Sequence, residues 1–447
     1  MVSSFDLVLR GGTCVTSKGT AIADIGVQEG KIAAIGELDL EASDHTIDVS
    51  HLCVLPGAID AQVHFREPGM EHKEDIATGT LAAVKGGVTT VFDMPNTKPP
   101  TINKAQLADK VARCHRRAWT DIAFFIGATP ENAEHLRELE RLPGVAGVKL
   151  FMGSSTGTLL VSEDAAIENV LRSGSRRLAA HCEEEARLKE RYELAVEGGT
   201  PHFHPVWRDE ETALLATRRL LKLAHKTGRK IHVLHVTTAG EMALLGKARD
   251  LASVEVTPQH LTLASPDCYD TLGTLAQMNP PIRGAAHRQA LWKAIADGVV
   301  DVVGSDHAPH TLEEKSKPYP QSPAGMPGVQ TLIPILLDHL NQGRLSLERL
   351  VELTSSRAAA IYGILGKGAI EIGFDADFTI VDLAAKRRIT NDWIASRVGW
   401  TPFDGMEVIG WPKMTILRGT LVMCEDEILG TPAGELVRFK ETATRND

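Results

Sequence analysis

The sequence has 447 residues, of which 43% are hydrophobic and 24% charged, as expected of a soluble globular protein with room for one large and one smaller domain. Its formal net charge of −10 excludes a generally basic surface, and with it nucleic acid and anionic membranes as general partners. A small-molecule substrate, including an anionic one at a local cationic site, is compatible with this charge.

Two further sequence patterns bear on where in the cell the protein is found. The six cysteines include no closely spaced pair, which is untypical of a disulfide framework or a thiolate zinc site. The sequence has neither an N-terminal secretion signal nor a run of the ~18 apolar residues that cross a bilayer. We therefore expect a cytoplasmic protein.

The sequence pattern of the N-terminal segment is typical of short β-strands. Alternating apolar residues at 5–10, 21–27 and 31–35 are separated by glycines, and the pair Gly11 and Gly12 predicts a turn after the first strand. No helix-length periodicity interrupts them. Residues 1–55 are therefore expected to form the first part of a small β-sandwich domain.

From residue 56 onward, apolar runs alternate with amphipathic stretches. A clear helical pattern covers residues 210–226. The apolar runs that read as buried strands number eight and lie at residues 54–60, 88–94, 121–128, 147–152, 178–180, 230–236, 253–257 and 299–303. Eight strand and helix alternations predict an α/β protein with a (β/α)8 TIM-type barrel, over residues 56–365.

After a helical region at residues 345–362, the sequence pattern again predicts β-strands. The runs at residues 378–381, 414–418 and 420–423 read as strands. Residues 366–447 are therefore expected to form the second part of the β-sandwich and a C-terminal tail, so that both chain ends meet in one domain beside the barrel.

Polar residues stand where the barrel strands are expected to end. Gln62, His64 and Arg66 follow the first strand at alternate positions, which places them on one face. Later strands end at further polar side chains: Asn96, Lys149, His181, His235 and Asp306. The active sites of such barrels lie at these carboxyl ends of the strands. Imidazole and carboxylate groups without cysteine favour Zn²⁺ over Mn²⁺, Fe²⁺ or Co²⁺.

Lys149 is unusual in this position, because a charged ammonium group is expensive to bury. It could pair with a carboxylate, lose its proton and act as a base, or react with CO₂ to give a carbamate that bridges two cations. The alternative is an ordinary lysine whose ammonium group reaches solvent.

Several runs carry a family resemblance. They are His-Phe-Arg-Glu-Pro-Gly at residues 64–69, Met-Pro-Asn-Thr at 94–97, Gly-Val-Lys at 147–149, Met-Asn-Pro-Pro at 278–281 and Ser-Asp-His-Ala-Pro-His at 305–310, with His181 and His235 between them. Together they resemble the dihydroorotases of the amidohydrolase superfamily. Gly-Phe-Asp-Ala-Asp at residues 373–377 is similar to a motif of that family's sandwich domain.

The resemblance implies a zinc site with one or two ions per chain. His64, His181 and His235 would be zinc ligands. Lys149, N6-carboxylated, would bridge two ions, and Asp306 would bind metal and carry the proton that moves during catalysis.

The resemblance also implies a set of substrate-binding residues: Arg66, Asn96, Asn279, His310, Pro327 and Gly328. Arg66, Asn96 and His310 would hold a substrate carboxylate, to which the arginine offers a planar fork of donors. Asn279 would lie near the pyrimidine ring, and the backbone of the loop at residues 324–328 would meet the ring amide.

One position departs from the resemblance. The family's first barrel strand usually ends in His-x-His, whereas this chain has glutamine at the first of these positions, Gln62. A neutral amide oxygen is a weaker zinc ligand than an imidazole nitrogen. We therefore expect weaker metal binding at the site that Gln62, His64, Lys149 and Asp306 would form.

The resemblance implies the interconversion of dihydroorotate and N-carbamoyl-L-aspartate in pyrimidine biosynthesis, by a homo-oligomer, either a dimer or a tetramer. Two alternatives stay open. The first is a related cyclic amidohydrolase that acts on hydantoins, dihydropyrimidines or allantoin, for which the carboxylate clamp of Arg66 and Asn96 would have no use. The second is a non-catalytic partner subunit, for which Gln62 is the only support in the sequence.

Overall fold

The computed structural model describes residues 5–39, 43–155 and 159–442. Its centre is an eight-stranded parallel sheet in chain order. The strands are β6 (Ala58–Val63), β7 (Val88–Asp93), β8 (Asp121–Gly127), β9 (Val145–Phe151), β10 (Leu178–His181), β11 (Ile231–Val233), β12 (Ala252–Val256) and β13 (Val302–Val303). The first strand meets the segment after the last, because the backbone nitrogen of His64 donates to the carbonyl of His307 at 2.8 Å. The predicted (β/α)8 barrel is confirmed.

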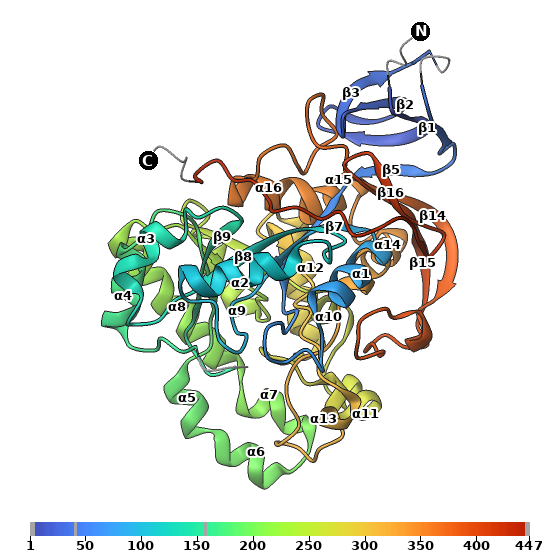
Figure 1. Cartoon of the computed structure of the whole chain (residues 1–447). Coiled ribbons are helices and arrows are strands. Elements are labelled where there is room, and N and C mark those ends of the chain that lie inside the picture. The colour runs from blue at the N-terminus through green and yellow to red at the C-terminus, as the bar shows by residue number, and fades with distance from the viewer. Residues whose placement is uncertain (1–4, 40–42, 156–158, 443–447) are drawn as a thin grey trace.

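Helices follow the strands and surround the barrel (Figure 1). The helices between consecutive strands include α1 (Ile76–Lys85), α2 (Lys104–Cys114), α3 (Leu136–Leu139), α4 (Asp164–Arg172), α8 (Glu210–Thr227), α9 (Ala239–Leu245) and α12 (Ala285–Ala296), and β13 is followed by α14 (Leu332–Asn341), α15 (Leu347–Val351) and α16 (Arg357–Tyr362). The longest, α8, matches its predicted pattern: Asp209 caps its first turn and Gly228 ends it in the left-handed conformation.

Shorter helices extend the loops at the carboxyl ends of the strands. They are α5 (Glu185–Glu190), α6 (Tyr192–Gly198) and α7 (His204–Trp207) after β10, α10 (Pro258–Thr262) and α11 (Asp267–Leu272) after β12, and α13 (Leu312–Lys315) after β13. In Figure 1 several of them gather at the lower edge of the molecule. These loops form the surroundings of the candidate site described below.

Both chain ends contribute to a second, nine-stranded mixed sheet. Its strands are β1 (Leu7–Thr16), β2 (Gly19–Gln28), β3 (Lys31–Gly36), β4 (Thr46–Asp48), β5 (Cys53–Pro56), β14 (Phe378–Arg388), β15 (Glu407–Leu417), β16 (Thr420–Cys424) and β17 (Glu427–Ile428). The two halves join where β5 pairs in parallel with β1 and antiparallel with β14. The expected meeting of the two chain ends is confirmed.

Two sequence predictions in this region are corrected. The glycine pair after residue 10 is a bulge inside β1 and not a turn, because the strand continues against β2 after a register shift. Gly11 has a φ of +70°, and a Cβ at Gly12 would meet Val54 at 2.7 Å, so both positions favour glycine. The apolar run at residues 54–60 is two strands of two sheets, β5 and β6, separated by Gly57. A Cβ there would lie 2.3 Å from Thr89.

The core lies between the barrel strands and their helices. Every residue of β6 to β13 is buried, as expected for parallel strands that are covered on both faces. A second apolar cluster joins Phe92 and Phe125 to Tyr362 and Phe439 from much later in the chain. This packing fixes the strands and therefore the side chains at their ends.

Candidate active site

The carboxyl ends of the barrel strands bring the predicted polar residues into one pocket. The residues that line it are Gln62, His64, Arg66, Asn96, Lys149, Phe151, Ser155, His181, His235, Asn279, Asp306, Ala308, Ala324 and Gly325. They come from six strands or the segments directly after them and from the loops around residues 279 and 324. All five predicted metal-site residues and three of the six predicted substrate-binding residues therefore meet in one place.

On one side of the pocket, Asp306 is held by two neighbours. The side-chain nitrogen of Gln62 donates to Asp306 Oδ1 at 3.0 Å, and His64 Nε2 lies 3.2 Å from the same oxygen. The other ring nitrogen of His64 is 2.7 Å from Asn96 Oδ1. Burial lowers the pKa of His64 and keeps the ring neutral at neutral pH.

On the other side, two histidines face each other. His181 Nδ1 lies 3.1 Å from His235 Nε2, and the rings meet edge to face. His181 Nε2 lies 2.9 Å from Glu183, a carboxylate that can only accept, so this nitrogen carries the ring proton and Nδ1 carries a lone pair. Burial lowers the pKa of both histidines. Two neutral imidazoles in this orientation are typical of a cation site.

Glu183 and Arg208 were not anticipated from the sequence. The Arg208 guanidinium donates to both carboxylate oxygens of Glu183, through Nε at 3.1 Å to one and through Nη2 at 2.5 Å to the other. Both side chains are buried, and the arginine holds the pKa of Glu183 well below its usual range. A carboxylate that is always ionised fixes the tautomer of His181. Glu183 could have been anticipated from its position, because it stands two residues after the predicted ligand His181.

The ammonium nitrogen of Lys149 is buried, so the interpretation of this residue as an ordinary solvent-reaching lysine is wrong. In the part of the chain that the structure describes, Nζ has no hydrogen-bond partner and lies 4.6 Å from the centre of the Phe151 ring. Burial lowers its pKa to about 8. A larger neutral fraction favours the two alternatives that need a free amine, a base or a carbamate.

The donor set fits a zinc ion. Facing imidazole nitrogens and a carboxylate are nitrogen and oxygen donors of the kind that bind this metal. The buried amine of Lys149, which has no partner among the described residues, would add oxygen donors as a carbamate. His235 Nδ1 likewise has no partner among the described residues.

Arg66 lies in the wall of the same pocket and is buried, with a φ of +63°. Its Nε donates to the carbonyl of Pro309 at 3.2 Å, and its Nη2 lies 3.4 Å from His310 Nε2. Within the described residues, Nη1 has no partner. Burial lowers the pKa of Arg66 to about 10, which leaves it a cation at neutral pH. The pocket therefore holds a positive charge with one free donor.

The other predicted substrate-binding residues lie at different places. Asn96 and Asn279 line the pocket, and His310 stands behind Arg66, where burial lowers its pKa to about 3. Pro327 and Gly328 instead line a neighbouring cavity, where Gly328 N donates to His307 Nδ1 at 3.1 Å. From the same loop it is Ala324 and Gly325 that reach the pocket.

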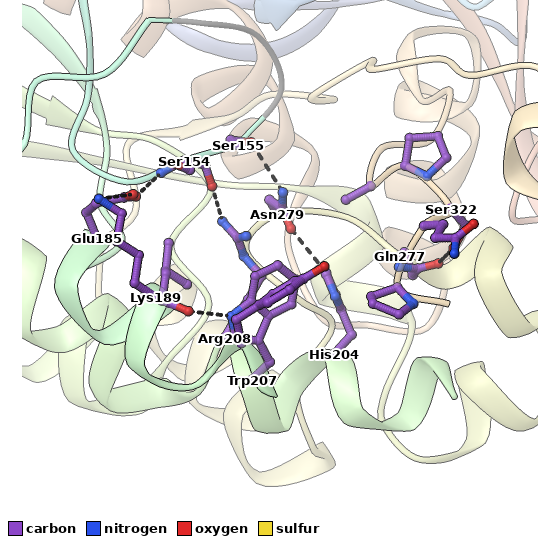
Figure 2. Close-up of a pocket in the computed structure, with 16 residues that line it drawn as sticks. Ser154, Ser155, Glu185, Lys189, His204, Trp207, Arg208, Gln277, Asn279 and Ser322 are labelled. Atoms are coloured by element: carbon purple, nitrogen blue, oxygen red, sulfur yellow. Dashed lines mark hydrogen bonds and ion pairs between the residues drawn. The ribbon is translucent and has the colours of Figure 1, made fainter. Parts of the chain in front are cut away.

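A larger outer cavity of about 450 Å³ adjoins the pocket (Figure 2). Ser155, Asn279 and Ala324 line both spaces, so the outer cavity and the inner pocket share a wall. The residues that line it further out include Leu188, Tyr192, His204, Trp207, Arg208, Gln277 and Ser322.

Lys315 fixes the loop that separates the two spaces. It is fully buried, and its ammonium group donates to the carbonyls of Gln277, Pro323 and Gly325 at 3.1, 2.9 and 3.1 Å. Three carbonyls satisfy three ammonium protons, so the last turn of α13 holds the pocket-lining end of the loop in place. The single helical turn of this segment is therefore tied to the loop around it.

Lys315→Met is therefore expected to loosen this loop. Three buried carbonyls would lose their donor, at about 1–3 kcal/mol each, so cleavage by a glutamate-specific protease after the exposed Glu313 should accelerate at least ~10-fold. Lys317→Met, an exposed position in the same loop, is the matched control and should leave the cleavage rate unchanged. Equal cleavage of the two variants would show that the ammonium group does not hold the loop.

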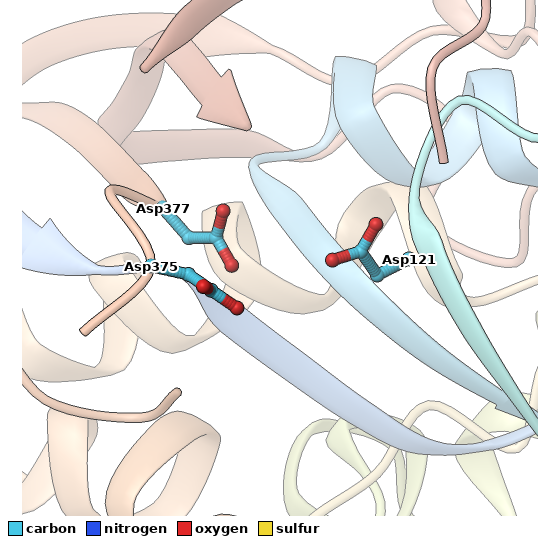
Figure 3. A group of neighbouring side chains, drawn as sticks. All are labelled: Asp121, Asp375 and Asp377. Carbon is cyan, nitrogen blue, oxygen red and sulfur yellow. The ribbon is translucent and has the colours of Figure 1, made fainter. Parts of the chain in front are cut away.

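A second acidic cluster lies outside this pocket (Figure 3). Oxygens of Asp121, Asp375 and Asp377 lie within 4.8 Å of one another, close enough for a metal ion. Their cation is already present, because Lys367 Nζ lies 2.7 Å from Asp121, 3.2 Å from Asp375 and in direct contact with Asp377. The cluster therefore joins strand β8 of the barrel to the segment before β14, and the role of the Gly-Phe-Asp-Ala-Asp run is structural.

Lys367→Met should destabilise the protein by about 3–5 kcal/mol, because it leaves the buried Asp377 carboxylate without its cation, whereas Asp121 and Asp375 keep Arg418 and Lys31. Urea unfolding at neutral pH measures this. Lys31→Met is the control: Lys31 binds Asp375 from a side chain that is 39% exposed, and its loss should cost under about 1 kcal/mol. Similar values for the two variants would contradict the structural role of Lys367.

A parallel eight-stranded barrel with imidazole, carboxylate and lysine groups buried at its strand ends is the architecture of a barrel hydrolase. The sequence matches the amidohydrolase family over residues 53–422, and the chain belongs to this family.

Individual relatives extend the match to nearly the whole chain. It is 36% identical to a dihydroorotase of Methanosarcina acetivorans, over 95% of this chain and 94% of that protein. It is 37% identical to a dihydroorotase of Pyrococcus furiosus, over 98% of each. Among solved structures, an L-hydantoinase (dihydropyrimidinase) of Arthrobacter aurescens has a TM-score of 0.91 and 30% identity, covering 97% of this chain and 99% of that one. Across the described ranges, no helix is both long and apolar enough to cross a bilayer.

Proposed function

We propose that this protein is a zinc-dependent cyclic amidohydrolase that interconverts dihydroorotate and N-carbamoyl-L-aspartate, in the cytoplasm and as a homo-oligomer. The observation that carries the proposal is Arg66, a buried cation with a free Nη1 in the same pocket as Asp306 and the facing histidines. The curated relatives named dihydroorotase, at 36% and 37% identity, support the same substrate.

The proposed zinc site uses His64, Lys149, His181, His235 and Asp306. A bound zinc ion would supply a Lewis acid that polarises the scissile carbonyl and lowers the pKa of water. His181 contributes the lone pair of Nδ1, because its other ring nitrogen is committed to Glu183. The buried amine of Lys149 is available as a base or, after reaction with CO₂, as an anionic carbamate.

Asp306 is proposed to carry the proton. Its carboxylate would take a proton from the attacking water and deliver it to the departing ring nitrogen. Gln62 and His64 orient this carboxylate through Oδ1. Arg66 and Asn96 would hold the substrate carboxylate, which places the ring amide between them and the histidines.

The proposal is tested by adding the purified protein, with its zinc, to dihydroorotate and following the loss of its ultraviolet absorbance. A substrate panel extends the test to hydantoin, dihydrouracil and allantoin. We expect kcat/KM to be highest for dihydroorotate. A higher value for an uncharged ring would support the hydantoinase alternative instead, for which the Arthrobacter structure is the specific observation. Turnover of none of these substrates by the zinc-loaded protein would support the non-catalytic subunit.

A further inference from the structure

The pocket has two halves, one around Asp306 and one around His181. They differ in how many of their polar groups already have hydrogen-bond partners. We infer that the chain holds one tightly bound divalent cation, at His181 and His235, and that the amide of Gln62 takes the place of a second cation at Asp306. This inference rests on the proposed metal dependence and specifies the number and position of the ions. It keeps Lys149, His181 and His235 as the zinc site and assigns His64 and Asp306 to hydrogen bonding in place of metal binding.

The half around Asp306 needs no cation. Two donors already reach Asp306 Oδ1: the Gln62 amide at 3.0 Å and His64 Nε2 at 3.2 Å. The amide must present its nitrogen here, because its oxygen would repel the carboxylate. His64 Nε2 then carries a proton and cannot ligate, and Nδ1 faces the side chain of Asn96 at 2.7 Å. Two donors thus satisfy Asp306 Oδ1, and the ring nitrogen of His64 that faces this carboxylate already carries a proton.

The half around His181 does need a cation. The lone pair of His181 Nδ1 points toward His235 Nε2 at 3.1 Å, and the other ring nitrogen of His235 has no partner among the described residues. The Lys149 amine nearby in the pocket has no partner among the described residues. The Arg208–Glu183 pair fixes His181 in the tautomer that a metal ligand requires. A divalent cation satisfies all of these groups at once.

Gln62 is therefore a positioning residue for Asp306. Its side chain is buried, and its amide oxygen has no partner within the described residues. As a neutral group it holds the carboxylate by a hydrogen bond without adding charge to the pocket. A histidine at this position could instead present a nitrogen lone pair beside His64 and Asp306.

The test is the zinc content of the protein after saturation with zinc and removal of the excess, measured by elemental mass spectrometry. We expect one zinc ion per chain in the wild type, and two in Gln62→His. His235→Ala should lose the ion. Gln62→Met and His64→Ala, which remove groups from the other half, should each keep it. Thermal unfolding establishes that each variant is folded.

A second readout is the visible absorption spectrum of the cobalt-substituted protein, which reports the ligand set directly. It should be the same in wild type and Gln62→Met, and it should change in Gln62→His. Two zinc ions in an active wild type, or loss of the ion in Gln62→Met or His64→Ala, would overturn this inference and leave the proposed function standing. One zinc ion at His181 and His235 without turnover of any cyclic amide would overturn the function and leave this inference standing.

Discussion

Asp306→Asn is expected to lower kcat for dihydroorotate by about 10³-fold, within the ~10²–10⁴-fold range of general acid–base catalysis. The substitution keeps an oxygen that can accept from the Gln62 amide, and it removes the charge and the ability to carry a proton. Asp306 is proposed to move a proton and not to hold the substrate carboxylate, so KM should change less than kcat.

The measurement is the steady-state rate of absorbance loss by wild type and variant at equal zinc content. Asp297→Asn, an exposed carboxylate at the end of α12, is the matched control and should retain wild-type kcat. A variant at Asp306 with more than about a tenth of wild-type kcat would exclude this carboxylate as the proton carrier, because a general acid–base contributes at least ~10²-fold.

Arg66→Met is expected to lower kcat/KM for dihydroorotate by about 10²-fold, since a hydrogen bond to a charged group is worth about 1.5–3 kcal/mol. The same variant should turn over hydantoin, which has no carboxylate, within about 3-fold of wild type, because that ring leaves the free Nη1 unused. The ratio of the two kcat/KM values is therefore the quantity to measure.

The control for general damage is Arg176→Met. Arg176 is another buried arginine, which donates to the carbonyl of Val145 outside the pocket. Its loss should change both substrates equally and leave the ratio as in wild type. If Arg66→Met also affected both substrates equally, the guanidinium would have no specific role with the substrate carboxylate, and an uncharged ring would become the better candidate substrate.

The architecture could be predicted because its signals are local. Parallel strands that are buried on both faces appear as apolar runs, and residues 88–94 and 121–128 match β7 and β8 closely. The errors came from tertiary contacts. The run at residues 54–60 belongs to two sheets because Gly57 allows the close approach of Thr89, and nothing in the sequence distinguishes one long strand from two.

The candidate site was predictable only in part. His64, His181, His235 and Asp306 follow strands, and strand ends of a barrel converge, so their proximity follows from topology. Arg208 and Lys315 lie in helical or loop segments whose partners are decided by folding. The loop at residues 324–328 has no period that fixes which residues point inward, which is why Ala324 and Gly325 line the pocket in place of Pro327 and Gly328.

The central claim is that a cation held by these strand-end residues makes water attack a cyclic amide. The most direct test is the rate of dihydroorotate hydrolysis while zinc is added back to the metal-free protein. We predict no measurable rate without zinc and a rate that rises in proportion to the zinc bound, reaching its full value at one ion per chain. A metal-free protein that hydrolyses dihydroorotate at the full rate, or a zinc-loaded protein that leaves it intact, would contradict the account.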